Sequence, residues 1–103
     1  MAKLITVEGE VKEVHPQDTE NGFTLEEVYN LIGRGCDMVE IAFRFTDEEE
    51  DDEEYMAICD EEGLMRQPQQ PYNWKATSMF IEKYHEPLYL AGNIVICNQK
   101  EFQ

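Results

Sequence analysis

Few side chains in this sequence could act as nucleophiles or metal ligands. The 103 residues include three cysteines, Cys36, Cys59 and Cys97, and two histidines, His15 and His85. A thiol beside an imidazole is the pairing that a cysteine nucleophile needs, because the imidazole takes the thiol proton. One reading of the chain is therefore a small enzyme or ligand-binding domain with a cleft near Cys59, His85 and Cys97.

Other features favour a structural role for these residues. Cys59 and Cys97 follow isoleucines in apolar, strand-like runs, where a free cysteine is typically a small buried hydrophobe. Three thiols at long spacings, without a C-x-x-C pair, form neither a disulfide framework nor a zinc ribbon. His85 follows a predicted helix, whose C-terminus favours a positive charge. We expect no catalytic residue, no metal and no cofactor, and a cytoplasmic location.

The chain is strongly acidic. Asp and Glu number 23 against 8 Lys and Arg, which gives a net charge of −15. A nucleic-acid binder needs a basic footprint to neutralise phosphates, and an anionic membrane would repel this chain. No apolar stretch is long enough to span a bilayer. If charge guides recognition, the partner is a basic protein.

Eight consecutive acids form the most conspicuous segment, from Asp47 to Glu54. Like charges at this density oppose compact local structure, so we expect a flexible acidic hairpin loop at residues 46–54. Three roles stay open: a solvated loop, a cation site, and a DNA-mimic decoy. In an extended chain alternate carboxylates repeat at roughly 6.6–6.8 Å, which is comparable to the phosphate spacing along one DNA strand. No glycine breaks the run as a calcium-binding loop requires, so no defined metal site is predicted.

Two groups of residues are candidates for partner binding. Tyr72 and Trp74 flank Asn73, which caps a predicted helix. The two aromatic side chains form either an interface patch, since Tyr and Trp dominate binding hot spots, or a staple of Tyr72 onto the first turn of the helix. From the acidic run we add Glu48, Glu50, Asp51 and Glu53.

Helices are predicted by caps and by apolar spacing. Thr24 and Glu27 form a capping box, and apolar residues recur at helical spacing over residues 24–32. Gly33 provides the positive φ that commonly ends a helix. A second helix is predicted over residues 74–84.

Five strands are predicted, over residues 3–7, 11–15, 38–45, 55–59 and 88–97. In the third strand, Val39, Ile41, Phe43 and Phe45 alternate and should share one face of a sheet. The last strand is apolar at nearly every position, which predicts a central strand covered on both faces.

The turns and ends complete the prediction. Gly63 is expected in the left-handed position of a tight turn, after which Leu64 and Met65 return to the core. Residues 98–103 are expected to be a polar tail. Residues 2–7 could form an edge strand with free pairing groups, so the chain is predicted to be a monomer or a weak homodimer. The element order is β-β-α-β-β-α-β, which indicates a single α+β domain over residues 1–103 with a mostly antiparallel sheet.

Several short blocks of the sequence support a family resemblance. They are AKLITVEG at 2–9, NGFTLEE at 21–27, MVEI at 38–41, MAICDEEGL at 56–64, PYNWKAT at 71–77 and AGNIVIC at 91–97. In these blocks the chain resembles a family of small uncharacterised bacterial proteins, also carried by phages and conjugative elements, classed as a domain of unknown function. The acidic run and residues 67–70 depart from that pattern. The resemblance implies context and no catalytic residues. We predict a non-enzymatic acidic interaction protein, accessory to a bacterial or mobile-element process, with a basic partner.

Overall fold

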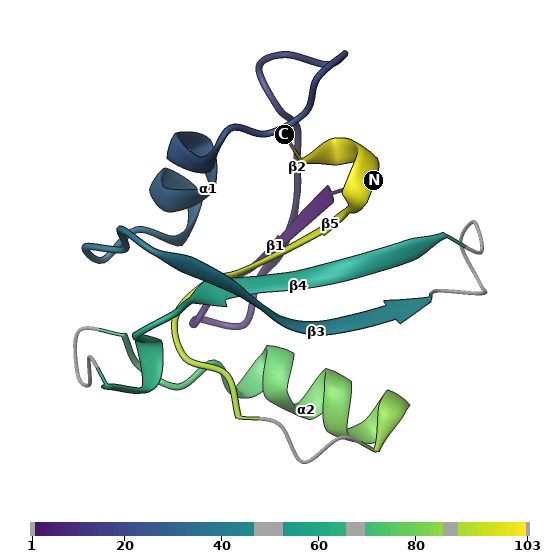
Figure 1. Cartoon of the computed structure of the whole chain (residues 1–103). Helices are drawn as coiled ribbons and strands as arrows, with labels where there is room; N and C mark the ends of the chain where they lie inside the picture. Colours follow the sequence, from purple (N-terminus) through teal and green to yellow (C-terminus); the bar gives the residue numbers. More distant parts are fainter. Residues whose placement is uncertain (1, 47–52, 66–69, 86–88, 103) are drawn as a thin grey trace.

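The computed structural model describes residues 2–46, 53–65, 70–85 and 89–102 (Figure 1). These residues form one antiparallel sheet of five strands with two α-helices, so the predicted α+β fold is confirmed. The strands follow the order β2-β1-β5-β4-β3. The elements are β1 (Ala2–Ile5), β2 (Val11–Val14), α1 (Leu25–Ile32), β3 (Val39–Thr46), β4 (Glu54–Asp60), α2 (Trp74–Tyr84) and β5 (Ile94–Asn98), with 3₁₀ helices η1 (Gly63–Met65) and η2 (Gln99–Glu101).

The two helices cover opposite faces of the sheet, as Figure 1 shows. The α1-side core consists of Ala2, Leu4, Phe23, Val28, Ile32, Met56, Ile58, Val95 and Cys97. The α2-side core consists of Ile5, Tyr55, Ala57, Cys59, Ala76, Phe80, Leu90, Ile94 and Ile96. All five residues of β5 are buried at the centre of the sheet, which confirms the prediction of a central strand. Within the described residues, neither helix has the length and hydropathy needed to cross a membrane.

Helix α1 begins at the predicted capping box. Glu27 donates its backbone N–H to Thr24 Oγ1 at 3.1 Å, and Thr24 donates its N–H to Glu27 Oε1 at 3.0 Å. The Glu27 carboxylate also accepts from the N–H of Gln17. Accepting these backbone hydrogen bonds, first from Gln17 and then from Thr24, lowers the pKa of Glu27. Gly33 follows the helix with a φ of 68°, as predicted.

Strand β3 departs from the predicted alternation at a β-bulge. Its register against β4 shifts between Ile41 and Phe43, so Ala42 is the extra residue. An extra residue moves the side chains that follow it to the opposite face of the sheet. Val39, before the bulge, packs against the α1-side core. The rings of Phe43 and Phe45 instead contact Phe80 of α2, with centroids 5.4 and 5.3 Å apart. The prediction that these β3 side chains share one face is therefore wrong beyond Ala42.

A turn is present at Glu61 and Glu62, as predicted, but the predicted left-handed conformation of Gly63 is wrong. Gly63 begins η1 and is not among the glycines with positive φ. It is buried against the backbone of Ala91, where an added Cβ would lie 3.3 Å from the Ala91 carbonyl oxygen. The prediction that Leu64 and Met65 return to the core is also wrong, because both are exposed in η1.

Both ends of the chain differ from their predicted positions. Strand β1 pairs with β2 on one side and β5 on the other, so residues 2–7 are not an edge strand. The predicted polar tail begins inside β5, continues as η2, and reaches Phe102, which forms a bridge with Phe23. Phe102 also packs against the α1-side core, so its ring ties this segment to the body of the domain.

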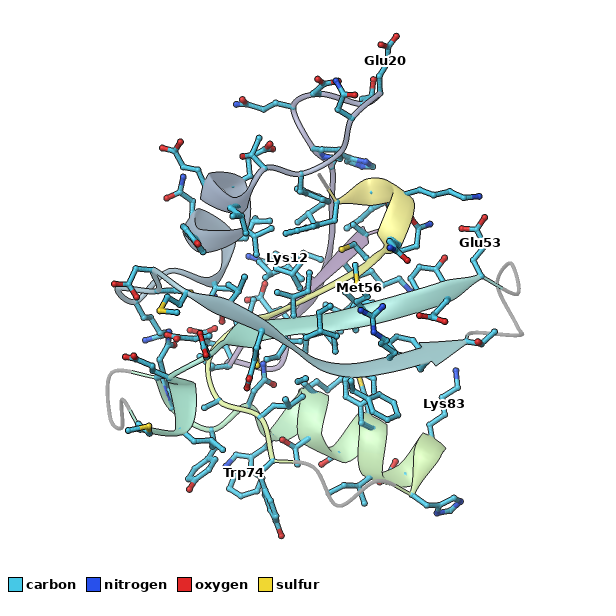
Figure 2. All side chains as sticks on the ribbon, viewed as in Figure 1. Lys12, Glu20, Glu53, Met56, Trp74 and Lys83 are labelled. Carbon is cyan, nitrogen blue, oxygen red and sulfur yellow. The ribbon has the colours of Figure 1, made fainter. Side chains whose placement is uncertain are left out.

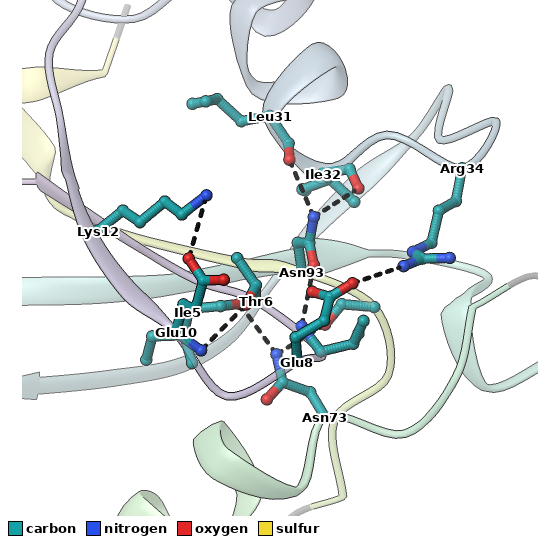
Figure 3. Close-up of polar contacts among 12 residues, drawn as sticks. Ile5, Thr6, Glu8, Glu10, Lys12, Leu31, Ile32, Arg34, Asn73 and Asn93 are labelled. Atoms are coloured by element: carbon teal, nitrogen blue, oxygen red, sulfur yellow. Dashed lines mark hydrogen bonds and ion pairs between the residues drawn. The ribbon is translucent and has the colours of Figure 1, made fainter.

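Two asparagines tie the helices to one end of the sheet (Figure 3). The Asn73 side chain caps α2 by accepting from Ala76 N–H at 3.0 Å. Its Nδ2 donates to the carbonyls of Ile5 and Gly92 at 3.0 and 2.9 Å. The Asn93 side chain holds the end of α1. Its Nδ2 donates to the carbonyls of the last two residues of α1, each at 3.3 Å, and its Oδ1 accepts a hydrogen bond from Val7 N–H. The start of α2 is thus fixed against the residues that precede β5.

Candidate partner-binding site

Tyr72 and Trp74 form an exposed aromatic pair beside the buried Asn73. Their ring centroids are 5.3 Å apart, and their residues are 43% and 61% exposed. In Figure 2 the Trp74 side chain projects away from the sheet at the start of α2. The Tyr72 ring therefore contacts Trp74 at the surface, which favours the patch interpretation over the staple.

A third aromatic residue belongs to the same surface. Tyr72 forms an antiparallel bridge with Ala91. Tyr89 lies two residues before Ala91 in the chain and is 58% exposed. We call Tyr72, Trp74 and Tyr89 the aromatic face. The centres of protein–protein interfaces are enriched in Tyr and Trp, so this exposed group is typical of a binding surface.

A cavity of about 280 Å³ adjoins the aromatic face through Tyr89 and Ala91. We call it the η1 pocket. Its lining comes from β3, the end of β4, η1 and residues 89–91. Its lining residues are Glu40, Ile41, Ala42, Cys59, Asp60, Glu61, Gly63, Leu64, Met65, Tyr89, Leu90 and Ala91.

The η1 pocket is electronegative. Three acidic residues, Glu40, Asp60 and Glu61, belong to its lining, which contains no Lys, Arg or His among the residues that the structure describes. Burial, and then the charges of Glu40 and Asp60, raises the pKa of the Cys59 thiol to about 12. The carboxyl of Asp60 is held by Gln70, whose Nε2 donates to it at 2.8 Å. The lining therefore suits a cationic group, and its thiol stays protonated at neutral pH.

The proposed cleft of Cys59, His85 and Cys97 is not assembled. Cys59 lies in the α2-side core and Cys97 in the α1-side core, on opposite faces of the sheet. Burial, as the first cause, raises the pKa of Cys97 to about 12 as well. His85 is an exposed residue with a φ of 57° at the C-terminus of α2. The reading of a cleft near these three residues is therefore wrong, because the sheet separates the two thiols.

The thiol environments predict which cysteine reacts in the folded protein. At about pH 8, dithionitrobenzoate should label Cys36 rapidly, because it is only partly buried, and should leave Cys59 and Cys97 unlabelled. Unfolding in guanidinium should release all three thiols. Rapid labelling of two or more thiols in the folded protein would contradict the burial described here, and Cys36→Ser is the control that should abolish the native reaction.

Glu53, the acidic candidate that the structure describes, does not belong to the aromatic face. Glu48, Glu50 and Asp51 lie outside the described residues. Glu53 accepts from Asn98 Nδ2 at 2.8 Å and pairs with Lys100 Nζ at 3.3 Å. It precedes β4, whereas the η1 pocket lies at the other end of that strand, about 20 Å away at the usual strand rise. Figure 2 likewise places Glu53 far from Trp74.

The η1 pocket was missed by sequence reasoning. Its walls come from segments near residues 40, 60 and 90, which only the fold brings together. One local signal is present, since Leu64 and Met65 follow an acidic turn, but their apolar character predicts a return to the core. Within the described ranges, no three His, Cys, Asp or Glu side chains gather in a way that could hold a metal ion.

Comparisons with known proteins give no relative for this chain. No family model, no curated protein and no solved structure matches it. The family resemblance of the short sequence blocks therefore stays a prediction, and the function is argued from the site alone.

Proposed function

We propose that this chain is a non-enzymatic interaction protein that binds a basic partner through the aromatic face. The observation that carries the proposal is the exposure of Tyr72, Trp74 and Tyr89 beside a pocket whose described lining includes acidic residues and no basic ones. Rigid aromatic rings supply contact area at an interface, and surrounding charges of one sign select partners of the opposite sign.

The surroundings of the aromatic face support this proposal. Asn73, which separates Tyr72 from Trp74, is fully buried and makes three side-chain hydrogen bonds, so the two rings rest on a fixed backbone. A preorganised patch loses little conformational entropy on binding. The net charge of −15 adds a long-range attraction for a basic protein, which speeds encounter. An accessory role in a bacterial or mobile-element process is part of the proposal and rests on the sequence resemblance.

The proposal is tested by affinity capture with a matched pair of variants. Trp74→Ala removes the largest exposed ring, and Leu25→Ala removes an exposed apolar side chain from the corresponding first position of α1. Captured basic proteins should be lost with Trp74→Ala and retained with Leu25→Ala, since hot-spot truncations cost about 2 kcal/mol or more. Circular dichroism should show both variants folded.

Salt dependence provides the second arm of this test. Binding that charge assists should weaken when salt shortens the screening length from about 10 Å at 0.1 M to about 3 Å at 1 M. Partners that survive Trp74→Ala unchanged, or that are acidic proteins, would contradict the proposed function.

A further inference from the structure

We propose that the η1 pocket receives a single Lys or Arg side chain of the basic partner. This inference rests on the proposed function and adds the side-chain class that the pocket recognises. It joins the pocket to the aromatic face as two parts of one binding surface.

The lining of the pocket matches the two halves of such a side chain. Lys and Arg have an apolar stem and a cationic head. Leu64 and Met65 supply exposed apolar contacts for the stem. The carboxylates of Glu40 and Glu61 supply counter-charges for the head.

Other occupants fit this lining less well. An anion would be repelled by the acidic residues of the lining, and a purely apolar side chain would desolvate the carboxylates of Glu40 and Glu61 without compensation. The cavity, at about 280 Å³, lies at the lower limit of the roughly 300–1,000 Å³ that enclose drug-sized ligands. Its size therefore suits one side chain. A Lys or Arg head also gains contact with the ring of Tyr89, because cations are attracted to aromatic faces.

The position of the pocket links it to the aromatic face. Ala91 lines the pocket and bridges Tyr72, and Tyr89 belongs to both surfaces. A partner segment that packs on the rings of Tyr72 and Trp74 therefore passes the mouth of the pocket. The rings would supply most of the affinity, and the pocket would select for a cationic residue at one position of that segment.

The test is an NMR titration of the ¹⁵N-labelled full chain with blocked amino acids. The probes are N-acetyl-lysine methylamide and N-acetyl-arginine methylamide, and the uncharged control is N-acetyl-norleucine methylamide, which has a stem of comparable length. Amide shifts are expected at residues 40–42, 61–64 and 89–91 with the cationic probes. The comparison of the two cationic probes decides which head the pocket prefers.

Variants that remove one carboxylate test whether the cationic probe binds in the η1 pocket. Glu40→Gln and Glu61→Gln should each weaken binding of the cationic probe about threefold, the scale of an exposed ion pair. Glu13→Gln, on the far edge strand β2, should leave the affinity unchanged. Equal binding of the norleucine probe, shifts spread over the whole acidic surface, or insensitivity to both pocket variants would overturn the inference.

Failure of this inference is distinguishable from failure of the proposed function. If capture depends on Trp74 while no probe perturbs residues 40–42, the interaction protein stands and the pocket inference is overturned. If the cationic probes bind the pocket but no captured protein depends on Trp74, the pocket inference stands and the proposed function fails.

Discussion

Replacing Asn73 with alanine is expected to lower the free energy of unfolding by about 3–4 kcal/mol. The substitution removes the cap of α2, which is typically worth about 1 kcal/mol. It also leaves the buried carbonyls of Ile5 and Gly92 without their side-chain donor, and each such loss costs roughly 1–3 kcal/mol. Urea unfolding followed by circular dichroism measures the change.

Two further variants separate the cap from the buried donors. Asn73→Asp keeps the cap acceptor but turns a charged oxygen toward two carbonyls, so it should destabilise at least as much as alanine at neutral pH. Asn30→Ala, on the exposed surface of α1, should change the stability by about 0.5 kcal/mol or less. A loss below about 1 kcal/mol for Asn73→Ala would show that the network in Figure 3 does not hold α2 to the sheet.

Replacing Gly22 with alanine is expected to destabilise the fold by about 3 kcal/mol. Its φ is 87°, and an added Cβ would collide with the backbone of Glu101 in η2. The conformation alone costs roughly 1–2 kcal/mol for a residue with a Cβ, and a clash with backbone has no flexible side chain to relieve it. The nearby Phe23 N–H bond to the Glu101 carbonyl, 2.6 Å long, would be strained as well.

Gly9 offers a matched control for Gly22. Its φ is 93°, but an added Cβ would meet no atom within 4 Å. Gly9→Ala should therefore cost only about 1 kcal/mol, the conformational penalty. Thermal unfolding of the two variants under the same conditions measures the difference. Equal losses would mean that the C-terminal segment is not packed against Gly22.

Local features of this fold were predictable because their causes are local. The capping box of α1 depends on two residues three positions apart, and Asn73 precedes an apolar helical pattern. The central position of β5 followed from its nearly uniform apolar character. Each of these features depends on residue types and spacing within about ten residues of the chain, so the sequence alone predicts it.

The features that the sequence did not reveal depend on tertiary contacts. The bulge at Ala42 moves Phe43 and Phe45 onto Phe80 of α2, a partner that is distant in sequence. Gly63 does not adopt a positive φ, and it lies so close to Ala91 that an added Cβ would be 3.3 Å from the Ala91 carbonyl oxygen. The C-terminal residues look polar, yet Phe102 anchors them in the α1-side core.

The candidate site was also predictable only in part from the sequence. Tyr72 and Trp74 were identifiable as a possible patch from their types and their position beside a helix cap. Their exposure, the addition of Tyr89 and the adjoining pocket required the bridge between Tyr72 and Ala91, which joins segments on either side of α2. The acidic run dominates the sequence, but its two described members, Glu53 and Glu54, lie at the end of β4 opposite the η1 pocket.

The most direct test of the binding surface is site-specific photo-cross-linking in cells that carry the gene. Benzoylphenylalanine replaces Tyr72 in one version of the protein and Val11, exposed on the edge strand β2, in the other. Position 72 should yield a discrete cross-link to one protein, through a segment rich in Lys and Arg, and position 11 should not. The same products from both positions, or a cross-linked segment without basic residues, would contradict the account.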